Sequence, residues 1–343
     1  MINTSCSVSA DRSRSTKNDV VVVCGAGGFI GGHLVASLRR DGITNIRAVD
    51  QKPLDRWFQR FDDVENFQVD LQELAACKRV LHGGAQCVYN LAADMGGMGF
   101  IEYNKALCML SVLINTHLLK AARDVGVEKF FFGSSACVYA ADKQASPDVI
   151  PLKEEDAYPA MPEDGYGWEK LFSERMCRHF TEDFDLPTCV ARYHNVYGPH
   201  GSYTGGREKA PAAICRKVIS AQLEGRSEIE IWGDGLQTRS FTYIDDCITG
   251  TRMMSDHCIP GPLNIGSSEL VTINQLVDLV EEIAGVKLKR RYNLDAPKGV
   301  NGRNSDNTKI RGVLNWEPAI RLRDGLEKTY RWIYDEMASL VTR

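Results

Sequence analysis

The chain has 343 residues, of which 43% are hydrophobic and 25% are charged, and its formal net charge is −4. This composition is typical of a globular protein and excludes disordered and fibrous classes, and the length allows a large two-lobed α/β unit or two domains. A slightly acidic chain offers no basic surface for nucleic acid or anionic lipid, so neither is expected as a partner.

The cysteines and the apolar runs indicate whether the protein binds metal, forms disulfides or enters a membrane. The eleven cysteines are scattered, without Cys-x-x-Cys pairs or Cys/His clusters at zinc-ligand spacing, so we expect no metal. Unpaired thiols of this kind favour a reducing compartment. No apolar run approaches the roughly 18 residues of a membrane helix, and the polar N-terminus lacks the apolar segment of a secretory signal. We therefore expect a soluble, cytoplasmic protein with no membrane partner and a disordered tail over residues 1–18.

The first half of the chain predicts strands that alternate with helices. From Val20, an apolar strand leads into a glycine-rich turn and a helix that stops at Gly42, and two further strands end at Asp50 and Asp70. The strands "AQCVYNLAA" and "KFFFGSS" follow, with an amphipathic helix over residues 104–125 between them. Such alternation indicates βαβ units, and the continuous apolar strands indicate a parallel sheet covered on both faces. We therefore expect an α/β fold, with a Rossmann-type doubly wound parallel sheet.

The second half predicts a smaller C-terminal lobe interleaved with this sheet. It contains the strand "TCVARYHNVYGP", a helix through Leu223, short strands within "IEIWGDGLQTRSFTYIDD", a helix over residues 272–284 and a last helix ending near Met337. No linker rich in Ser and Pro separates the two parts. We therefore assign residues 19–190 to the Rossmann domain, with residues 240–262 returning to it. We assign residues 191–239 and 263–343 to the smaller lobe.

A glycine triplet marks the candidate cofactor site. Gly25, Gly28 and Gly31 form G-x-x-G-x-x-G between the predicted strand and helix. Glycines there allow a tight turn and let the backbone approach a pyrophosphate, while the helix N-terminus offers N–H groups to the anion. The candidate NAD-binding residues of this loop are Gly25, Gly28, Phe29, Ile30 and Gly31.

Two aspartates at strand ends are candidates for the cofactor's ribose. Asp50 lies about twenty residues beyond the loop, where a carboxylate accepts from both ribose hydroxyls and repels a 2′-phosphate, which favours NAD over NADP. The alternative for Asp50 is a strand-end cap. Asp70 is a second candidate, and it could equally be a helix N-cap.

Tyr166 and Lys170 in "YGWEK" are a candidate redox pair. Four residues apart at the start of a predicted helix, they lie on one face, and the ammonium is expected to lower the phenol pKa from its usual value of about 10. A phenolate so placed can take a proton from a sugar hydroxyl during oxidation. With the glycine loop and Ser135, the pair resembles the extended short-chain dehydrogenase/reductase superfamily that acts on nucleotide sugars. The resemblance covers residues 19–337 and implies that Ser135 hydrogen-bonds the reacting oxygen, Tyr166 is the base and Lys170 holds the nicotinamide ribose.

Cys137, in "SSACVY", has two interpretations. By itself, a cysteine there is more often a buried packing residue than a reactive one. However, "ADMGGMGF", "SSACVY", "GGREKAP" and "GRNSDN" closely resemble the GDP-mannose 3,5-epimerase family. The resemblance implies that Cys137 is a base and Lys209 the opposing acid, on opposite faces of the sugar. A ketone at sugar carbon 4 acidifies the hydrogens on carbons 3 and 5, and a thiol and an amine can exchange those protons if the site lowers their pKa values. Which group acts at which carbon stays open.

The resemblance further implies a substrate, products and an assembly. The substrate would be GDP-D-mannose and the product GDP-L-galactose, with GDP-L-gulose as a second product, in ascorbate biosynthesis. The smaller lobe would bind the nucleotide sugar, and a homodimer would form through helices such as 104–125 and 166–183. Cationic side chains suit the diphosphate, although each alone is more often a surface residue. The candidate substrate-binding residues are Gly96, Ser135, Ala136, Cys137, Asn195, Glu208, Lys209, Ala210, Lys217, Gln237, Thr238, Arg239 and Arg303.

Two rival functions stay open. The first is an NAD-dependent 4-epimerase or dehydrogenase for a UDP- or dTDP-sugar, which would exchange no hydrogen next to the ketone and would not need Lys209. The second is a catalytically silent NAD-binding regulator. The joint presence of Ser135, Tyr166 and Lys170 disfavours that second reading.

Overall fold

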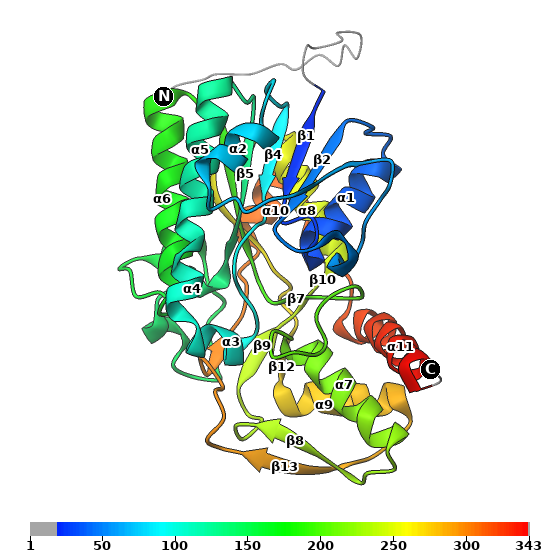
Figure 1. Ribbon diagram of the computed structural model, residues 1–343. Coiled ribbons are helices and arrows are strands. Elements are labelled where there is room, and N and C mark those ends of the chain that lie inside the picture. Colours follow the sequence, from blue (N-terminus) through cyan, green and yellow to red (C-terminus); the bar gives the residue numbers. More distant parts are fainter. Residues whose placement is uncertain (1–18, 342–343) are drawn as a thin grey trace.

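The computed structural model describes residues 19–341 and contains one large sheet with a smaller lobe beneath it (Figure 1). The expected tail over residues 1–18 lies outside the described residues. All neighbouring strands of the large sheet are parallel, in the order β3-β2-β1-β4-β5-β6-β11. The strands are Val21–Cys24 (β1), Ile46–Asp50 (β2), Glu65–Gln68 (β3), Cys87–Asn90 (β4), Phe130–Ser135 (β5), Thr188–Tyr193 (β6) and Gly261–Ile265 (β11).

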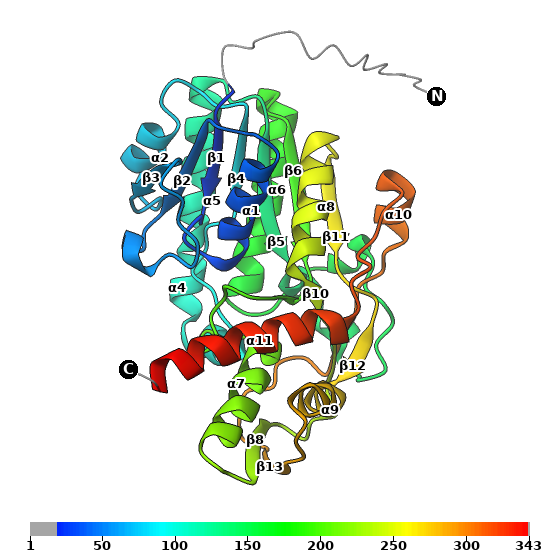
Figure 2. The same ribbon diagram turned by 90° about the vertical axis from the view of Figure 1, so that its right-hand side faces the viewer.

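Helices cover both faces of this sheet, which is why its central strands are apolar throughout. Alternate residues of β1 point to opposite faces: Val21 and Val23 join the core cluster that includes Leu34, while Val22 and Cys24 join the cluster on the other face. In Figures 1 and 2, one face of the sheet is covered by α1 (Phe29–Arg40) and α8 (Ile244–Asp256). The opposite face is covered by α2 (Leu74–Val80), α5 (Ser111–Val125) and α6 (Tyr166–Phe184). The predicted doubly wound Rossmann sheet is confirmed.

The smaller lobe is built from two short sheets and three longer helices. Helix α11 packs on α7 and α9, and it crosses below the large sheet in Figure 2. One sheet pairs β8 with β13, and the other has the order β12-β9-β14. The elements are α7 (Ala210–Leu223), α9 (Ile273–Ala284), α11 (Leu322–Val341), β8 (Glu228–Trp232), β13 (Lys289–Asn293), β12 (Leu270–Thr272), β9 (Thr238–Ser240) and β14 (Gly302–Arg303).

Several shorter elements connect the two parts. Strand β7 (Val196–Tyr197) pairs with β10 (Thr242–Tyr243), which ties the end of β6 to the segment that returns to the large sheet. Helix α3 (Met98–Tyr103) follows β4, and helix α10 (Thr308–Leu314) packs beside β11. Short 3-10 turns occur at Leu54–Arg56, Ala136–Val138, Ala141–Gln144 and Glu154–Ala157.

Three sequence-based boundaries differ from the structure. The single helix expected over 104–125 is divided into α4 (Lys105–Met109) and α5, although Leu110 between them keeps right-handed helical angles, so the interruption is local. The return to the large sheet runs to Ile265 rather than residue 262, because β11 pairs with β6 through that residue. The last helix continues to Val341, past the expected end near Met337.

Among residues 19–341, none of the helices combines the length and apolar character that spanning a bilayer would require. The same residues contain no group of three or more His, Cys, Asp or Glu side chains arranged to hold a metal ion.

Candidate active site

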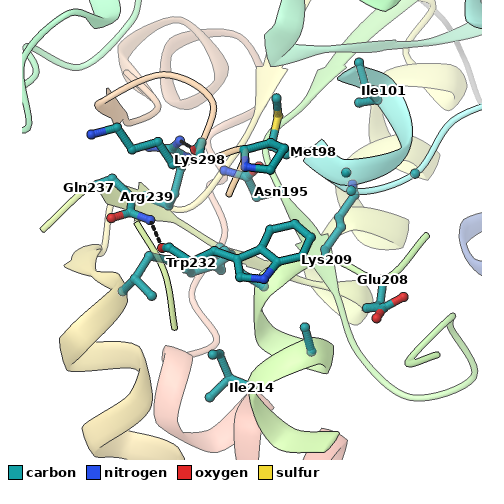
Figure 3. A pocket seen from close by; sticks show the side chains of 18 of the residues that line it. Met98, Ile101, Asn195, Glu208, Lys209, Ile214, Trp232, Gln237, Arg239 and Lys298 are labelled. Atoms are coloured by element: carbon teal, nitrogen blue, oxygen red, sulfur yellow. Dashed lines mark hydrogen bonds between the residues drawn. The ribbon is translucent and has the colours of Figure 1, made fainter. Parts of the chain in front are cut away.

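A cavity of about 420 Å³ lies between the carboxyl ends of β5 and β6 and the smaller lobe (Figure 3). Its wall combines residues from the 95–101 segment, the β5 end, the start of α6 and the start of α7. Of the predicted substrate-binding residues, those that line it are Gly96, Ser135, Ala136, Cys137, Asn195, Glu208, Lys209, Ala210, Lys217, Gln237, Arg239 and Arg303.

Thr238 is the predicted substrate-binding residue that does not line this cavity. It lies on β9, where successive side chains point to opposite faces, so Arg239 points to the cavity and Thr238 points away from it. The Thr238 hydroxyl instead donates to the Pro147 carbonyl oxygen at 2.5 Å. We therefore remove Thr238 from the candidate contacts.

The glycine-rich loop between β1 and α1 has the shape needed to hold a pyrophosphate. Gly25 has φ +83, and a β-carbon there would lie 2.9 Å from the Ala92 backbone nitrogen. A β-carbon at Gly31 would collide with the Gly25 carbonyl oxygen. Gly28 is the N-cap of α1, so Phe29 and Ile30 begin the helix and point its first N–H groups toward the loop. The residues present therefore fit a dinucleotide cofactor.

The two candidate ribose residues differ in their surroundings. Asp50 ends β2 in a nearly buried position, and its Oδ1 accepts the Lys52 backbone N–H at 3.0 Å. Asp70 is exposed, and its Oδ1 accepts the Gln72 backbone N–H at 2.8 Å. Each carboxylate thus accepts a backbone N–H two residues further along the chain. For Asp50 this agrees with the alternative interpretation as a strand-end cap, whereas the alternative for Asp70, a helix N-cap, is wrong. Glu73, rather than Asp70, is the N-cap of α2.

Tyr166 and Lys170 lie on one face of α6, beside the end of β5. The Lys170 Nζ atom lies 5.5 Å from the Tyr166 ring centroid and 3.6 Å from the Glu169 Oε2 atom. Burial raises the pKa of Tyr166 well above its usual value, and the hydrogen bond with Ser135 opposes this only in part. The pKa of Tyr166 is therefore shifted upward, opposite to the direction expected from Lys170, and desolvation is the largest cause.

Cys137 and Lys209 reach the same cavity from different parts of the fold. Cys137 lies in the turn after β5, where its backbone N–H donates to the Ser135 Oγ atom at 3.2 Å, and Lys209 is the N-cap residue of α7. In Figure 3 the Lys209 side chain points from α7 toward the segment of Met98. Burial raises the pKa of the Cys137 thiol and lowers the pKa of the Lys209 amine. Burial thus shifts both groups toward their neutral forms, whereas the sequence-based assignment begins from a thiolate and an ammonium.

Two buried guanidinium groups lie side by side in the cavity wall. Arg239 on β9 and Arg303 on β14 are register partners in adjacent parallel strands. Burial, followed by the charge of Arg303, lowers the pKa of Arg239 to about 9. Lys217 adds a third cation, and its Nζ donates to the Glu230 carbonyl oxygen at 2.8 Å. Like charges at this spacing repel each other, so a bound anion would stabilise the arrangement.

Several acceptor atoms around the cavity have no partner. Glu208 Oε2, Gln237 Oε1 and Glu163 Oε1 are buried and make no hydrogen bond within the described part of the chain. Buried polar atoms are normally paired, so vacant acceptors around a cavity suit a ligand rich in hydroxyl or N–H groups.

Sequence reasoning missed several residues of this site. Glu163, Met98, Trp232 and Lys298 were not predicted, although the last three line the cavity and Glu163 bonds to its wall. Glu163 lies three residues before Tyr166, so a search for carboxylates next to the Tyr/Lys pair could have found it. Trp232 precedes the turn "GDG" at the end of a predicted strand. An aromatic residue at such a position is as consistent with a core residue as with one that lines a cavity.

Comparison with known proteins places the chain in a family. Residues 21–266 match the NAD dependent epimerase/dehydratase family. The chain is 44% identical over 318 residues to GDP-mannose 3,5-epimerase 1 of Oryza sativa subsp. japonica, covering 92% of this chain and 82% of the relative. It is 42% identical over 323 residues to GDP-mannose 3,5-epimerase of Arabidopsis thaliana, covering 94% and 84%. The chain belongs to the NAD dependent epimerase/dehydratase family, among the GDP-mannose 3,5-epimerases.

A solved structure of the same family supports the assignment of fold and cofactor. UDP-glucuronic acid 4-epimerase from Bacillus cereus, in complex with UDP-glucuronic acid and NAD, is 26% identical, with a TM-score of 0.76 over 92% of this chain and 99% of that one. The present chain belongs to an NAD dependent family, and its own glycine loop between β1 and α1 fits that dinucleotide.

Proposed function

We propose that the protein inverts carbons 3 and 5 of GDP-mannose, giving GDP-L-galactose and GDP-L-gulose. The observation that carries this proposal is the meeting of a thiol and an amine, Cys137 and Lys209, in the cavity that also contains Tyr166 and Ser135. Two proton-exchanging groups from different lobes are what inversion at carbon requires, because one face must lose a proton and the other must receive one.

The cofactor would be held by the glycine loop, Asp50 and Lys170. NAD bound there supplies the reversible oxidation of the sugar's carbon 4 hydroxyl to a ketone. Tyr166 exchanges the proton of that hydroxyl, and Ser135 hydrogen-bonds the same oxygen. Burial raises the pKa of the Tyr166 phenol, and a cationic nicotinamide held beside Lys170 would act in the opposite direction.

The inversion chemistry then depends on two side chains. A ketone at carbon 4 makes the hydrogens on carbons 3 and 5 acidic. Cys137 and Lys209 together hold one proton that can reside on either group, as thiol with amine or as thiolate with ammonium. The group without the proton removes one from the sugar, and the other group returns one to the opposite face.

The nucleotide end of the substrate would lie against the cations of the smaller lobe. Arg239, Arg303 and Lys217 bind the diphosphate, with Asn195 beside it on the path from β6. The buried, unpartnered oxygens of Glu208 and Gln237 accept hydrogen bonds from hydroxyl or N–H groups of the ligand.

Proton exchange with solvent tests this function directly. The purified protein would be incubated with GDP-mannose in deuterium oxide, and the sugar protons followed by NMR alongside Cys137→Ala. We expect deuterium at carbons 3 and 5 with the wild type and none with the folded variant. Absence of exchange at both carbons in the wild type would contradict the proposal, and turnover of a UDP- or dTDP-sugar instead would establish the 4-epimerase alternative.

We also propose that the protein forms a homodimer in the cytoplasm and serves ascorbate biosynthesis. All ten described cysteines are free thiols, which suits a reducing compartment. An exposed apolar surface supports the dimer, since its helices α4, α5 and α6 pack on one another. Its residues, each between 37% and 50% exposed, are Met109, Leu110, Leu113, Trp168 and Phe172. Phe172→Glu should convert the dimer into a monomer in light scattering, and a monomeric wild type would contradict this assembly.

A further inference from the structure

Glu163 occupies a position next to Cys137 that the proposed mechanism leaves unused. Its backbone N–H donates to the Cys137 carbonyl oxygen at 3.0 Å, which fixes the segment before α6 against the turn after β5. Its side chain is only 16% exposed, and the Oε2 atom lies 3.3 Å from the Arg303 Nη2 atom. The Oε1 atom is buried and has no hydrogen-bond partner within residues 19–341.

Arg303 joins this carboxylate to the thiol. Its Nη1 atom lies 3.5 Å from the Cys137 Sγ atom, and its Nε donates to the Gln144 Oε1 atom at 2.6 Å. One guanidinium therefore contacts the thiol and the carboxylate with two of its nitrogens, while Gln144 fixes its orientation. The thiol, the guanidinium and the carboxylate form one buried cluster at the wall of the cavity.

We propose that Glu163 is a positioning residue that determines whether Cys137 begins the reaction as a thiol or as a thiolate. This inference rests on the proposed function, because it concerns the proton shared by Cys137 and Lys209. The Glu163 carboxylate keeps the proton on sulfur by balancing the charge of Arg303 and by offering its vacant Oε1 atom as an acceptor for the S–H group. Without this charge, Arg303 would stabilise the thiolate, and the shared proton would move toward the Lys209 amine.

The other charged and titratable groups around the thiol come from four further elements. Arg239 on β9 and Lys209 at the start of α7 are cationic when protonated and favour the thiolate. Tyr166 on α6 and Cys108 on α4 are neutral when protonated and add little charge. Burial and then Glu163 raise the pKa of Cys137, and Arg303 lowers it. Removal of the Glu163 carboxylate should therefore have the largest effect on the equilibrium between the thiol and the thiolate of Cys137.

The test measures the reactivity of Cys137 itself, so it does not depend on turnover. Wild type and Glu163→Gln would be treated with iodoacetamide from pH 5 to pH 10 without substrate, and labelling of the Cys137 peptide would be followed by mass spectrometry. Because the thiolate is the reactive form, the midpoint of the profile reports the thiol's pKa. We expect Glu163→Gln to lower this midpoint by about one pH unit or more, which is the effect of one adjacent charge.

Two matched variants separate charge from shape. Asp164→Asn removes the neighbouring carboxylate, which is exposed and pairs with Lys105, and should leave the midpoint and the exchange activity unchanged. Arg303→Gln should raise the midpoint, because the cation that favours the thiolate is lost. If Glu163→Gln does not fold, Glu163→Ala takes its place with the same expected direction.

An unchanged or raised midpoint in the Glu163 variant would overturn the inference. The pH dependence of deuterium exchange at the sugar provides a second measurement: its acidic limb should move to lower pH in Glu163→Gln by a similar amount. Failure of the wild type to exchange any deuterium would remove the proposed function but would leave the labelling profile interpretable, so the two failures can be distinguished.

Discussion

Replacing Arg239 with methionine tests whether the cavity binds a diphosphate. The Arg239 guanidinium donates to the carbonyl oxygens of Thr238, Lys298 and Val300, and no carboxylate of residues 19–341 pairs with it. Its register partner is Arg303, so two cations share one buried wall. Glu163 pairs with Arg303 alone, so the charge of Arg239 stays unpaired beside a like charge, and a bound anion would offset the repulsion.

Arg239→Met should change two quantities, the Kd for GDP and the free energy of unfolding of the protein without GDP. A hydrogen bond to a charged group contributes about 1.5–3 kcal/mol, and about 1.4 kcal/mol corresponds to a factor of ten in affinity. The Kd for GDP should therefore rise about 10- to 150-fold in Arg239→Met. The free energy of unfolding of the empty protein should change by only about 1 kcal/mol, because removal of the repelling buried charge offsets the loss of three carbonyl contacts.

Calorimetric titration with GDP and thermal unfolding with and without GDP would measure both quantities. Arg226→Met is the matched control, since Arg226 is exposed, pairs with Glu224 and lies outside the cavity. At a GDP concentration of 100 times Kd, the wild type should gain about 2.7 kcal/mol of stability, and the Arg239 variant much less at that same concentration. Wild-type affinity for GDP in Arg239→Met would refute the assignment of this wall to the diphosphate.

Three further substitutions test other parts of the site and fold. Gly31→Ala places a β-carbon against the Gly25 carbonyl, so the purified protein should lose most of its bound NAD by absorbance, whereas Gly312→Ala, with open space around it, should retain it. Lys209→Gln should abolish deuterium exchange at carbons 3 and 5 while GDP still binds, and retained exchange would remove Lys209 from the chemistry. Burial lowers the pKa of His194 to about 3, below its unfolded value near 6.5, so the stability from its neutral form is present above pH 6.5 and is lost as the pH falls toward 3. For His194 this amounts to about 1.4 kcal/mol less stability at pH 5.5 than at pH 7.5. The partly buried His33 and His200, whose pKa values are also lowered, add to the total loss in urea unfolding. His194→Gln should remove its own share of the loss, and the exposed control His82→Gln should keep it.

The large sheet and its glycine loop could be predicted because local signals specify them. Continuous apolar strands such as β1 follow from burial on both faces, and Gly25 and Gly31 are required by contacts within a few residues of the loop and with the end of β4. The division of the helix at Leu110 was not predictable in the same way, because its apolar pattern continues through the interruption.

The parts of the site that were missed depend on side-chain direction and on long-range packing. Thr238 was grouped with its neighbours by motif, although strand alternation turns it away from the cavity. The pKa of Tyr166 was expected to be lowered by one neighbour, but it is raised, and desolvation of the buried phenol is the largest cause. The sequence marks Glu163 only as a carboxylate close to Tyr166, because its contact with Arg303 joins residues that are 140 positions apart in the chain.

The location of the chemistry explains why the two lobes are interleaved. Cys137 follows a strand of the large sheet, whereas Lys209 begins a helix of the smaller lobe, and the inversion proposed above requires both at one sugar ring. A flexible hinge between separate domains would let their separation vary. Here the chain leaves the sheet after β6, builds α7 and β8, and returns through β10 and β11, so the lobe is attached at several points. Arg303 adds a further link, because it reaches from β14 to the thiol itself. The separation of Cys137 and Lys209 is thus set by the whole fold. If they exchange protons as proposed, a substitution that loosens these attachments should slow inversion at carbon before it weakens NAD binding.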